Sequence, residues 1–138
     1  MYHGEKRLAR LSKPLPMRMG CILITVMDFE ISPTDLQQIL ASHSTPADTQ
    51  NFVLLDVREP WEFEAASIAG STLMPMGEIR SRLQELDPEA HIVTVCHHGV
   101  RSLNVALWLR QQDFENVQSL RGGIDAWSAQ IDSAVPRY

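Results

Sequence analysis

The chain of 138 residues is 44% hydrophobic and 21% charged, a composition typical of one globular domain with its own core. Its net charge of −5 is spread unevenly, because residues 1–20 carry five cations and one acid, whereas the remaining residues carry a net charge of −9. So acidic a domain argues against nucleic acid as a partner, and no apolar run reaches the roughly 20 residues that would span a membrane.

Residues 1–26 are expected to be a poorly ordered N-terminal extension, followed by one domain over residues 27–138. Pro14 and Pro16 interrupt the extension, and its charge is opposite to that of the domain. An apolar run over 21–27 follows the basic residues, but it is short for a signal peptide and acidic residues come next. The extension is therefore not expected to direct export, although a targeting signal is the alternative.

The cysteine content indicates the compartment. Cys21 and Cys96 are too few for a disulfide scaffold, although a single pair could form. Two free thiols are typical of a reducing compartment, so we expect a cytoplasmic protein without a membrane partner.

Strand and helix patterns alternate along the domain. Residues 29–31 form a short expected strand, and Ser32-Pro33 is a helix start with a serine N-cap and a proline in the first turn. The continuous apolar run 52–57 is typical of a strand that is buried on both faces. A short helix that starts at Glu59-Pro60 and a weak strand over 71–74 follow.

The alternation continues to the end of the chain. Ile79, Leu83 and Leu86 have helical spacing and predict a helix that stops at Asp87-Pro88. The remaining expected elements are strand 91–95, helix 102–112, strand 117–120 and helix 124–131. Such alternation implies a parallel sheet with helices on both faces, and ligands of such sheets bind beyond the carboxyl ends of the strands.

The most informative segment runs from Val95 to Ser102 and contains Cys96. This cysteine follows a predicted strand, and the backbone N–H groups of the loop and of the next helix favour negative charge there. The position therefore favours a nucleophilic thiolate. The alternative is a buried structural thiol, which we disfavour because the loop is too polar to sit in a core.

Two further residues of this loop indicate anion binding. A cation such as Arg101 is unfavourable at a helix N-terminus, so we expect it to hold an anion, the alternative being a solvated arginine. Gly99 is expected to have a positive φ, which would let successive N–H groups converge on the sulfur.

Other polar residues are less specific. His97 and His98 are adjacent and have no second Cys/His cluster nearby in sequence, so we predict no metal site. They are expected either to tune a pKa or contact substrate, or to be solvated loop residues. Asp56 and Arg58 close a strand, either as a structural ion pair or with Arg58 as a second cation toward Cys96. Nucleotide-binding and serine-hydrolase motifs are absent, and we predict no cofactor.

Three segments together resemble the rhodanese-like single-domain sulfurtransferase family. They are Leu54–Phe63, Val95–Ser102 and Gly122–Trp127, in the order and spacing of the family signatures. The resemblance covers about residues 28–131 and implies an α/β fold with a mainly parallel five-stranded sheet and helices on both faces. The chain departs from the family at 66–71, where Ala-Ser-Ile-Ala-Gly-Ser stands in place of the common Gly-His-Ile-Pro-Gly-Ala.

The resemblance implies a thiosulfate sulfurtransferase with Cys96 as the nucleophile. The cysteine would take a sulfane sulfur from thiosulfate or a persulfide donor, become a persulfide, and pass the sulfur to a thiophilic acceptor. The residues implied to bind substrate are His97, His98, Gly99, Val100, Arg101 and, more weakly, Arg58. Phosphatase relatives have one residue more between cysteine and arginine, so the Cys-x4-Arg spacing here favours sulfur transfer over phosphate hydrolysis.

Two other functions fit the same loop. One is a sulfur-relay module that passes sulfur between partner proteins with little turnover of small molecules. The other is a non-catalytic binding domain, against which the intact loop argues. Turnover of thiosulfate and cyanide would separate the enzyme from the relay module.

Overall fold

The computed structural model describes residues 29–42 and 51–138. The extension that the sequence analysis expected over 1–26 lies outside the described residues, and so does Cys21. All predicted site residues, from Arg58 to Arg101, lie within the described part.

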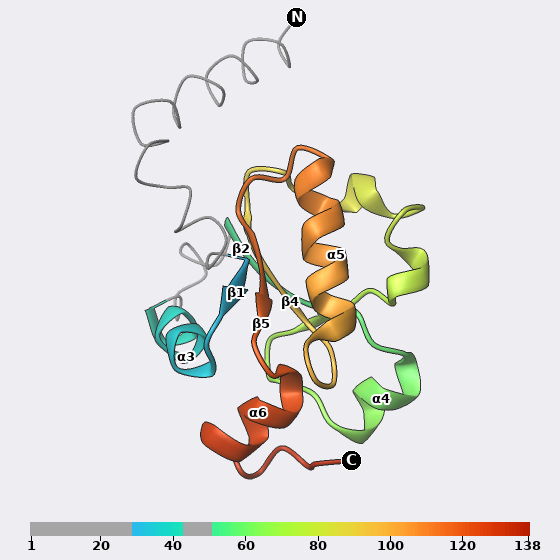
Figure 1. The fold of residues 1–138 in the computed structure, drawn as a ribbon. Coiled ribbons are helices and arrows are strands. Elements are labelled where there is room, and N and C mark those ends of the chain that lie inside the picture. The colour runs from blue at the N-terminus through green and yellow to red at the C-terminus, as the bar shows by residue number, and fades with distance from the viewer. Residues whose placement is uncertain (1–28, 43–50) are drawn as a thin grey trace, which may run out of the picture.

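Within these ranges, five parallel strands form one sheet in the order β1-β5-β4-β2-β3. The strands are β1 (Glu30–Ile31), β2 (Phe52–Asp56), β3 (Thr72–Leu73), β4 (His91–Val95) and β5 (Val117–Leu120). The helices are α3 (Pro33–Ser42), α4 (Pro60–Ala65), α5 (Val100–Gln111) and α6 (Gly123–Gln130). Of the helices in the described part, none is long and apolar enough to cross a membrane. The predicted α/β fold is confirmed (Figure 1).

The sheet separates two hydrophobic cores, because successive residues of a strand point to opposite faces. In β2, Leu54 packs into the core formed with α3 and α6, and Leu55 packs into the core formed with α5. Val93 and Ile92 of β4 divide in the same way. Figure 1 shows α3 and α5 on opposite sides of the sheet. Cys96 continues the alternation and lies on the α5 side.

The helix predicted from Ile79, Leu83 and Leu86 is wrong. Two 3-10 turns, η3 (Met76–Glu78) and η4 (Leu83–Glu85), occupy this part of the chain. Ile79 and Leu86 are nevertheless buried in the α5-side core, and Leu83 packs against it. Ile79 and Leu86 directly follow the two turns as their C-caps, and Leu83 begins the second turn, so an apolar pattern of this length does not require an α-helix.

The carboxyl ends of β2 and β4 bring the predicted site segments together. The two strands pair Asp56 with Val95, and the N–H of Val57 donates to the C=O of Val95 at 3.0 Å. Cys96 and Arg58, which follow these strands, therefore start from neighbouring positions at the same edge of the sheet, as expected for a ligand site in a parallel sheet.

Candidate active site

The Sγ atom of Cys96 accepts hydrogen bonds from the loop and from the first turn of α5. Among the described residues, the N–H of Gly99 donates to it at 3.0 Å, and the N–H and hydroxyl of Ser102 each donate at 3.3 Å. These donors converge on one sulfur at a helix N-terminus, where unpaired N–H groups and the helix dipole favour an anion. The arrangement can stabilise a thiolate on Cys96.

The conformation of Gly99 produces this convergence. Its φ of 106° lies in the left-handed region, as the sequence analysis predicted, and it is the N-cap of α5. A Cβ at this position would lie 3.3 Å from the backbone N of Gly122 and 3.5 Å from the C=O of Leu120. Glycine is therefore favoured here for two reasons: the loop turns with a positive φ, and its backbone lies close to the backbone that follows β5.

The expectation that Cys96 would not be buried is wrong. The residue is 1% exposed, packs in the α5-side core and is a free thiol. The loop is polar, but it covers the sulfur without entering the core itself, since the side chain of His98 is 64% exposed and Val100 is 71% exposed. Cys96 is thus a thiol beneath an exposed loop.

Buried hydroxyl groups support the loop from below, and the sequence analysis missed them. Thr94, Ser102 and Ser119 are each 0% exposed. The Ser102 and Ser119 hydroxyls lie 2.7 Å apart, so Ser119 can donate to Ser102 while Ser102 donates to the sulfur. The Thr94 hydroxyl donates to the C=O of Ser102 at 2.8 Å. Polar residues at inward-facing positions of apolar strands are the signal that could have revealed this network.

Arg101 forms a bidentate ion pair with Glu62. The Nη1–Oε2 and Nη2–Oε1 distances are 2.8 Å and 2.9 Å, and the side chains are 36% and 5% exposed, respectively. The hydrogen bonds to Glu62 are the largest cause that raises the pKa of Arg101, and the charges of Glu62 and Cys96 add to it. The anion that pairs with Arg101 in this structure is therefore a carboxylate of α4. Binding of a substrate anion by Arg101 stays a prediction.

Glu62 is a candidate site residue that the sequence analysis overlooked. Besides Arg101, its carboxylate accepts the Tyr138 hydroxyl at 2.7 Å and the N–H of Glu59, the N-cap of α4, at 3.0 Å. The Arg101 hydrogen bonds are the largest cause that lowers the pKa of Glu62 to about 2, against an opposing effect of burial. Glu62 is thus a permanent anion at neutral pH, and Arg101 is its main partner.

Arg58 is completely buried, and its guanidinium is used inside the domain. Its Nε and Nη2 atoms donate to the Asp56 carboxylate at 2.8 Å and 2.6 Å. Its other contacts are the C=O groups of Glu62 and Ala66 and the hydroxyl of Tyr138. These are the contacts of a structural ion pair that holds α4 against β2, and none of them points to substrate.

Comparison with known proteins identifies the family. A model of the rhodanese-like domain matches residues 32–130. The chain belongs to the rhodanese-like domain family. It is 34% identical over 90 residues to the thiosulfate sulfurtransferase GlpE of Pseudoalteromonas translucida, a match that covers 65% of this chain and 86% of that protein. The resemblance stated for the three sequence segments is confirmed.

Two other comparisons support the assignment. The chain is 32% identical over 127 residues to the rhodanese-like/PpiC domain-containing protein 12, chloroplastic, of Arabidopsis thaliana, covering 88% of this chain but only 42% of that protein. A solved structure of a rhodanese-related protein from Thermoplasma volcanium is 29% identical, with a TM-score of 0.63, and covers 74% of this chain and 92% of its own. The chain thus spans less than half of the Arabidopsis relative and nearly all of the shorter ones.

Aromatic rings stack beside the Cys96 loop of this rhodanese-like domain. Tyr138 stacks on His97 with a centroid distance of 4.1 Å, and His97 stacks on His98 at 3.9 Å. Burial, and then the neighbouring His98, lowers the pKa of His97. The Tyr138 hydroxyl lies between Arg58, which donates to it at 2.9 Å, and Glu62. Nothing local to Tyr138 in the sequence links it to the loop, so only the tertiary structure reveals it.

Replacement of Glu62 by glutamine should remove an acid-sensitive part of the stability. Because the pKa of Glu62 is about 2 in the folded protein and ordinarily 4.5, ionised Glu62 stabilises the fold above about pH 4.5, and this contribution is lost as the pH falls toward 2. The full shift corresponds to about 3 kcal/mol. In urea denaturation at pH 7, we expect Glu62→Gln to be less stable than the wild type by about 2–3 kcal/mol, with the difference reduced to about half at pH 3.

Glu85→Gln is the matched control for this measurement. It removes an exposed carboxylate that pairs with Arg82 at 2.9 Å, and exposed pairs contribute little to stability. Its effect should be small at both pH values. A stability difference between wild type and Glu62→Gln that does not change with pH would contradict the assignment of the lowered pKa to Glu62.

Proposed function

We propose that the protein is a sulfurtransferase that moves a sulfane sulfur from thiosulfate or a persulfide donor to a thiophilic acceptor through a persulfide on Cys96. The observation that carries the proposal is the convergence of the Gly99 and Ser102 donors on Sγ between β4 and α5. Membership of the rhodanese-like family supports it. The partners are a small sulfur donor and acceptor, the chemistry uses no cofactor, and we place the protein in the cytoplasm.

The reaction has two displacement steps. The Cys96 thiolate attacks the sulfane sulfur of thiosulfate, a new S–S bond forms, the donor's S–S bond breaks, and sulfite leaves with the bonding electrons. An acceptor such as cyanide then attacks the outer sulfur and releases the Cys96 thiolate. Donors around the sulfur stabilise the negative charge of both the thiolate and the persulfide without rearrangement.

The remaining site residues contribute to the proposed reaction in three ways: through main-chain groups, through side chains, or indirectly. Main-chain groups of the loop hold the transferred sulfur, while the side chains that face an incoming substrate are those of His97, His98, Val100 and Arg101. Arg58 acts on substrate only indirectly, because it supports the α4 segment that positions Glu62.

A specific observation favours the relay module as the second candidate. Val100, the first residue of α5, is 71% exposed, and Trp61 is 64% exposed. Trp61 lies edge-on to Tyr138 at 6.0 Å, and Tyr138 stacks on His97, so both exposed apolar side chains border the loop. Tryptophan is enriched at protein–protein interfaces, so its position beside the loop supports contact with a donor or acceptor protein.

One pair of measurements tests the proposal and separates the two candidates. The protein is incubated with thiosulfate and its intact mass is measured, and thiocyanate formation from thiosulfate and cyanide is followed at steady state. A gain of one sulfur atom with turnover indicates the enzyme, and the same gain without turnover indicates the relay module. Neither sulfur gain nor turnover, with thiosulfate or with a persulfide donor, would refute sulfur transfer through Cys96.

Arg101→Ala should slow alkylation of Cys96 by anionic iodoacetate more than alkylation by neutral iodoacetamide. The substitution removes a cation near the sulfur and leaves the Glu62 carboxylate without its main partner. At low ionic strength we expect roughly a fivefold to tenfold loss with iodoacetate, since a unit charge a few ångströms away contributes on the order of 1 kcal/mol there. Rates measured at one pH for both reagents give the comparison.

Two variants control this experiment. Glu62→Gln releases Arg101 from its ion pair and should accelerate the iodoacetate reaction, the opposite direction. Arg82→Ala removes an arginine that pairs with Glu78 and Glu85, and should leave both rates unchanged. Equal slowing of both reagents by Arg101→Ala would show that Arg101 does not attract anions to the site.

A further inference from the structure

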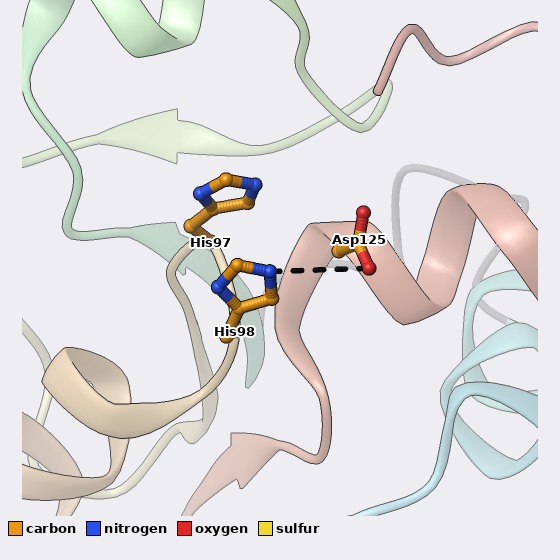
Figure 2. Close-up of side chains that lie close together, drawn as sticks. All are labelled: His97, His98 and Asp125. Carbon is orange, nitrogen blue, oxygen red and sulfur yellow. Dashed lines mark ion pairs between the residues drawn. The ribbon is translucent and has the colours of Figure 1, made fainter. Parts of the chain in front are cut away.

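We propose that His97, His98 and Asp125 form a binding site for a divalent transition-metal ion such as Zn²⁺. Each residue offers one ligand atom, and within the described part of the chain these atoms all lie within 4.8 Å of one another. Figure 2 shows the two imidazole rings on the loop that follows β4, with Asp125 facing them from the start of α6. The Nε2 atom of His98 lies 4.0 Å from Oδ2 of Asp125.

The chemistry of these ligands selects the class of ion. Two imidazole nitrogens and one carboxylate oxygen suit Zn²⁺ and its neighbours in the first transition series, whereas Mg²⁺ and Ca²⁺ prefer sites made of oxygen ligands alone. Bonds of about 2.0–2.1 Å to a tetrahedral ion place ligand atoms roughly 3.3 Å apart, so ligand atoms that lie up to 4.8 Å apart must approach one another by up to about 1.5 Å. Rotation of His98, whose side chain is 64% exposed, can provide it. Three protein ligands leave a fourth position for water or an anion.

Backbone hydrogen bonds join the loop that carries the two histidines to the start of α6, which carries Asp125. The N–H of Asp125 donates to the C=O of His97 at 3.1 Å, and the N–H of Ile124 donates to the C=O of Cys96 at 2.8 Å. Gly123 permits this contact, since a Cβ there would collide with both carbonyl groups. The Tyr138 ring lies against the His97 ring, with an interplanar angle of 12°. These contacts fix the backbone of the site, so metal binding has to reorient side chains only.

The sequence analysis predicted no metal site, because His97 and His98 are adjacent and no second Cys/His cluster lies nearby in the sequence. Adjacent residues point apart in a helix or strand, but in this loop the His97 and His98 rings are stacked with an interplanar angle of 21°. The third ligand, Asp125, lies in α6. It is too far along the chain from the two histidines for a local spacing in the sequence to indicate it.

Arg137 competes for the carboxylate. Its Nε and Nη2 atoms donate to the two oxygens of Asp125 at 3.0 Å and 3.1 Å, and its side chain is 60% exposed. An ion that binds Asp125 must share or displace this arginine. Because exposed ion pairs are weak, we expect a metal to displace it, and removal of Arg137 should tighten metal binding.

Zinc titration of the full chain by isothermal calorimetry, with Co²⁺ absorption spectra as a second readout, tests the site. We expect one Zn²⁺ per chain and visible Co²⁺ bands typical of tetrahedral coordination. His98→Ala and Asp125→Asn, both at surface positions, should weaken binding at least roughly tenfold. Arg137→Ala should tighten it roughly threefold or more.

Two controls identify the ligands. Cys96→Ser should bind Zn²⁺ as the wild type does, because the sulfur does not belong to the cluster. His91→Ala removes a histidine that is hydrogen-bonded to Gln118 and should also leave binding unchanged. The assignment is overturned by an absence of binding at micromolar Zn²⁺, by binding that survives both His98→Ala and Asp125→Asn, or by binding that is lost in Cys96→Ser. Sulfur transfer enters none of these readouts, so the result does not depend on the proposed function.

Discussion

Cys96→Ser should abolish sulfur transfer, with a loss of at least about a thousandfold in turnover, because a serine hydroxyl cannot form or release a persulfide. The fold should remain, since the smaller oxygen can accept hydrogen bonds from the same groups of Gly99 and Ser102. The measurements are thiocyanate formation, intact mass after thiosulfate treatment, and thermal unfolding by circular dichroism.

The chain provides its own matched control for this prediction. Cys21→Ser removes the other cysteine and should leave both the activity and the sulfur gain intact. Ser102→Ala, which keeps the nucleophile but removes one donor to it, should lose about tenfold in turnover. The proposed mechanism would be wrong if Cys96→Ser still gained sulfur and Cys21→Ser did not, because the persulfide would then form on Cys21.

Gly123→Ala should destabilise the domain by about 3 kcal/mol or more and distort the active-site loop. A Cβ at this position would collide with the carbonyl groups of Cys96 and His97, and the φ of 66° is unfavourable for a side chain. Both groups are backbone acceptors for the first turn of α6, so the helix cannot shift without losing these hydrogen bonds. Urea denaturation measures the loss of stability, and turnover should fall with it.

Gly77→Ala is the control for this substitution. A Cβ at Gly77 would meet no atom within 4 Å, and the free energy of unfolding should change by less than about 0.5 kcal/mol. If the two variants were equally stable, the close packing of α6 against the Cys96 loop would not hold in solution.

Local patterns in the sequence were sufficient for the sheet and for the position of Cys96 between a strand and a helix. The apolar run of β2 and the strand–loop–helix order around Cys96 predict parallel strands with a cysteine at a carboxyl end, because strand and helix periodicities act over a few neighbouring residues. The positive φ of Gly99 followed from the same local geometry, since a chain that turns its N–H groups toward one sulfur needs glycine there.

Long-range packing decided what the local patterns left open. The burial of Cys96 depends on how its loop lies over the α5-side core, and the partner of Arg101 depends on where α4 places Glu62. Ile79 and Leu86 reach the core from positions that directly follow 3-10 turns, because burial selects the direction of a side chain and not the type of helix beside it. The meeting of the His97–His98 pair with Asp125 and Tyr138 likewise arises only when the C-terminal segment packs beside the loop. Contacts between residues so distant in the chain depend on tertiary packing, which no periodicity in the sequence encodes.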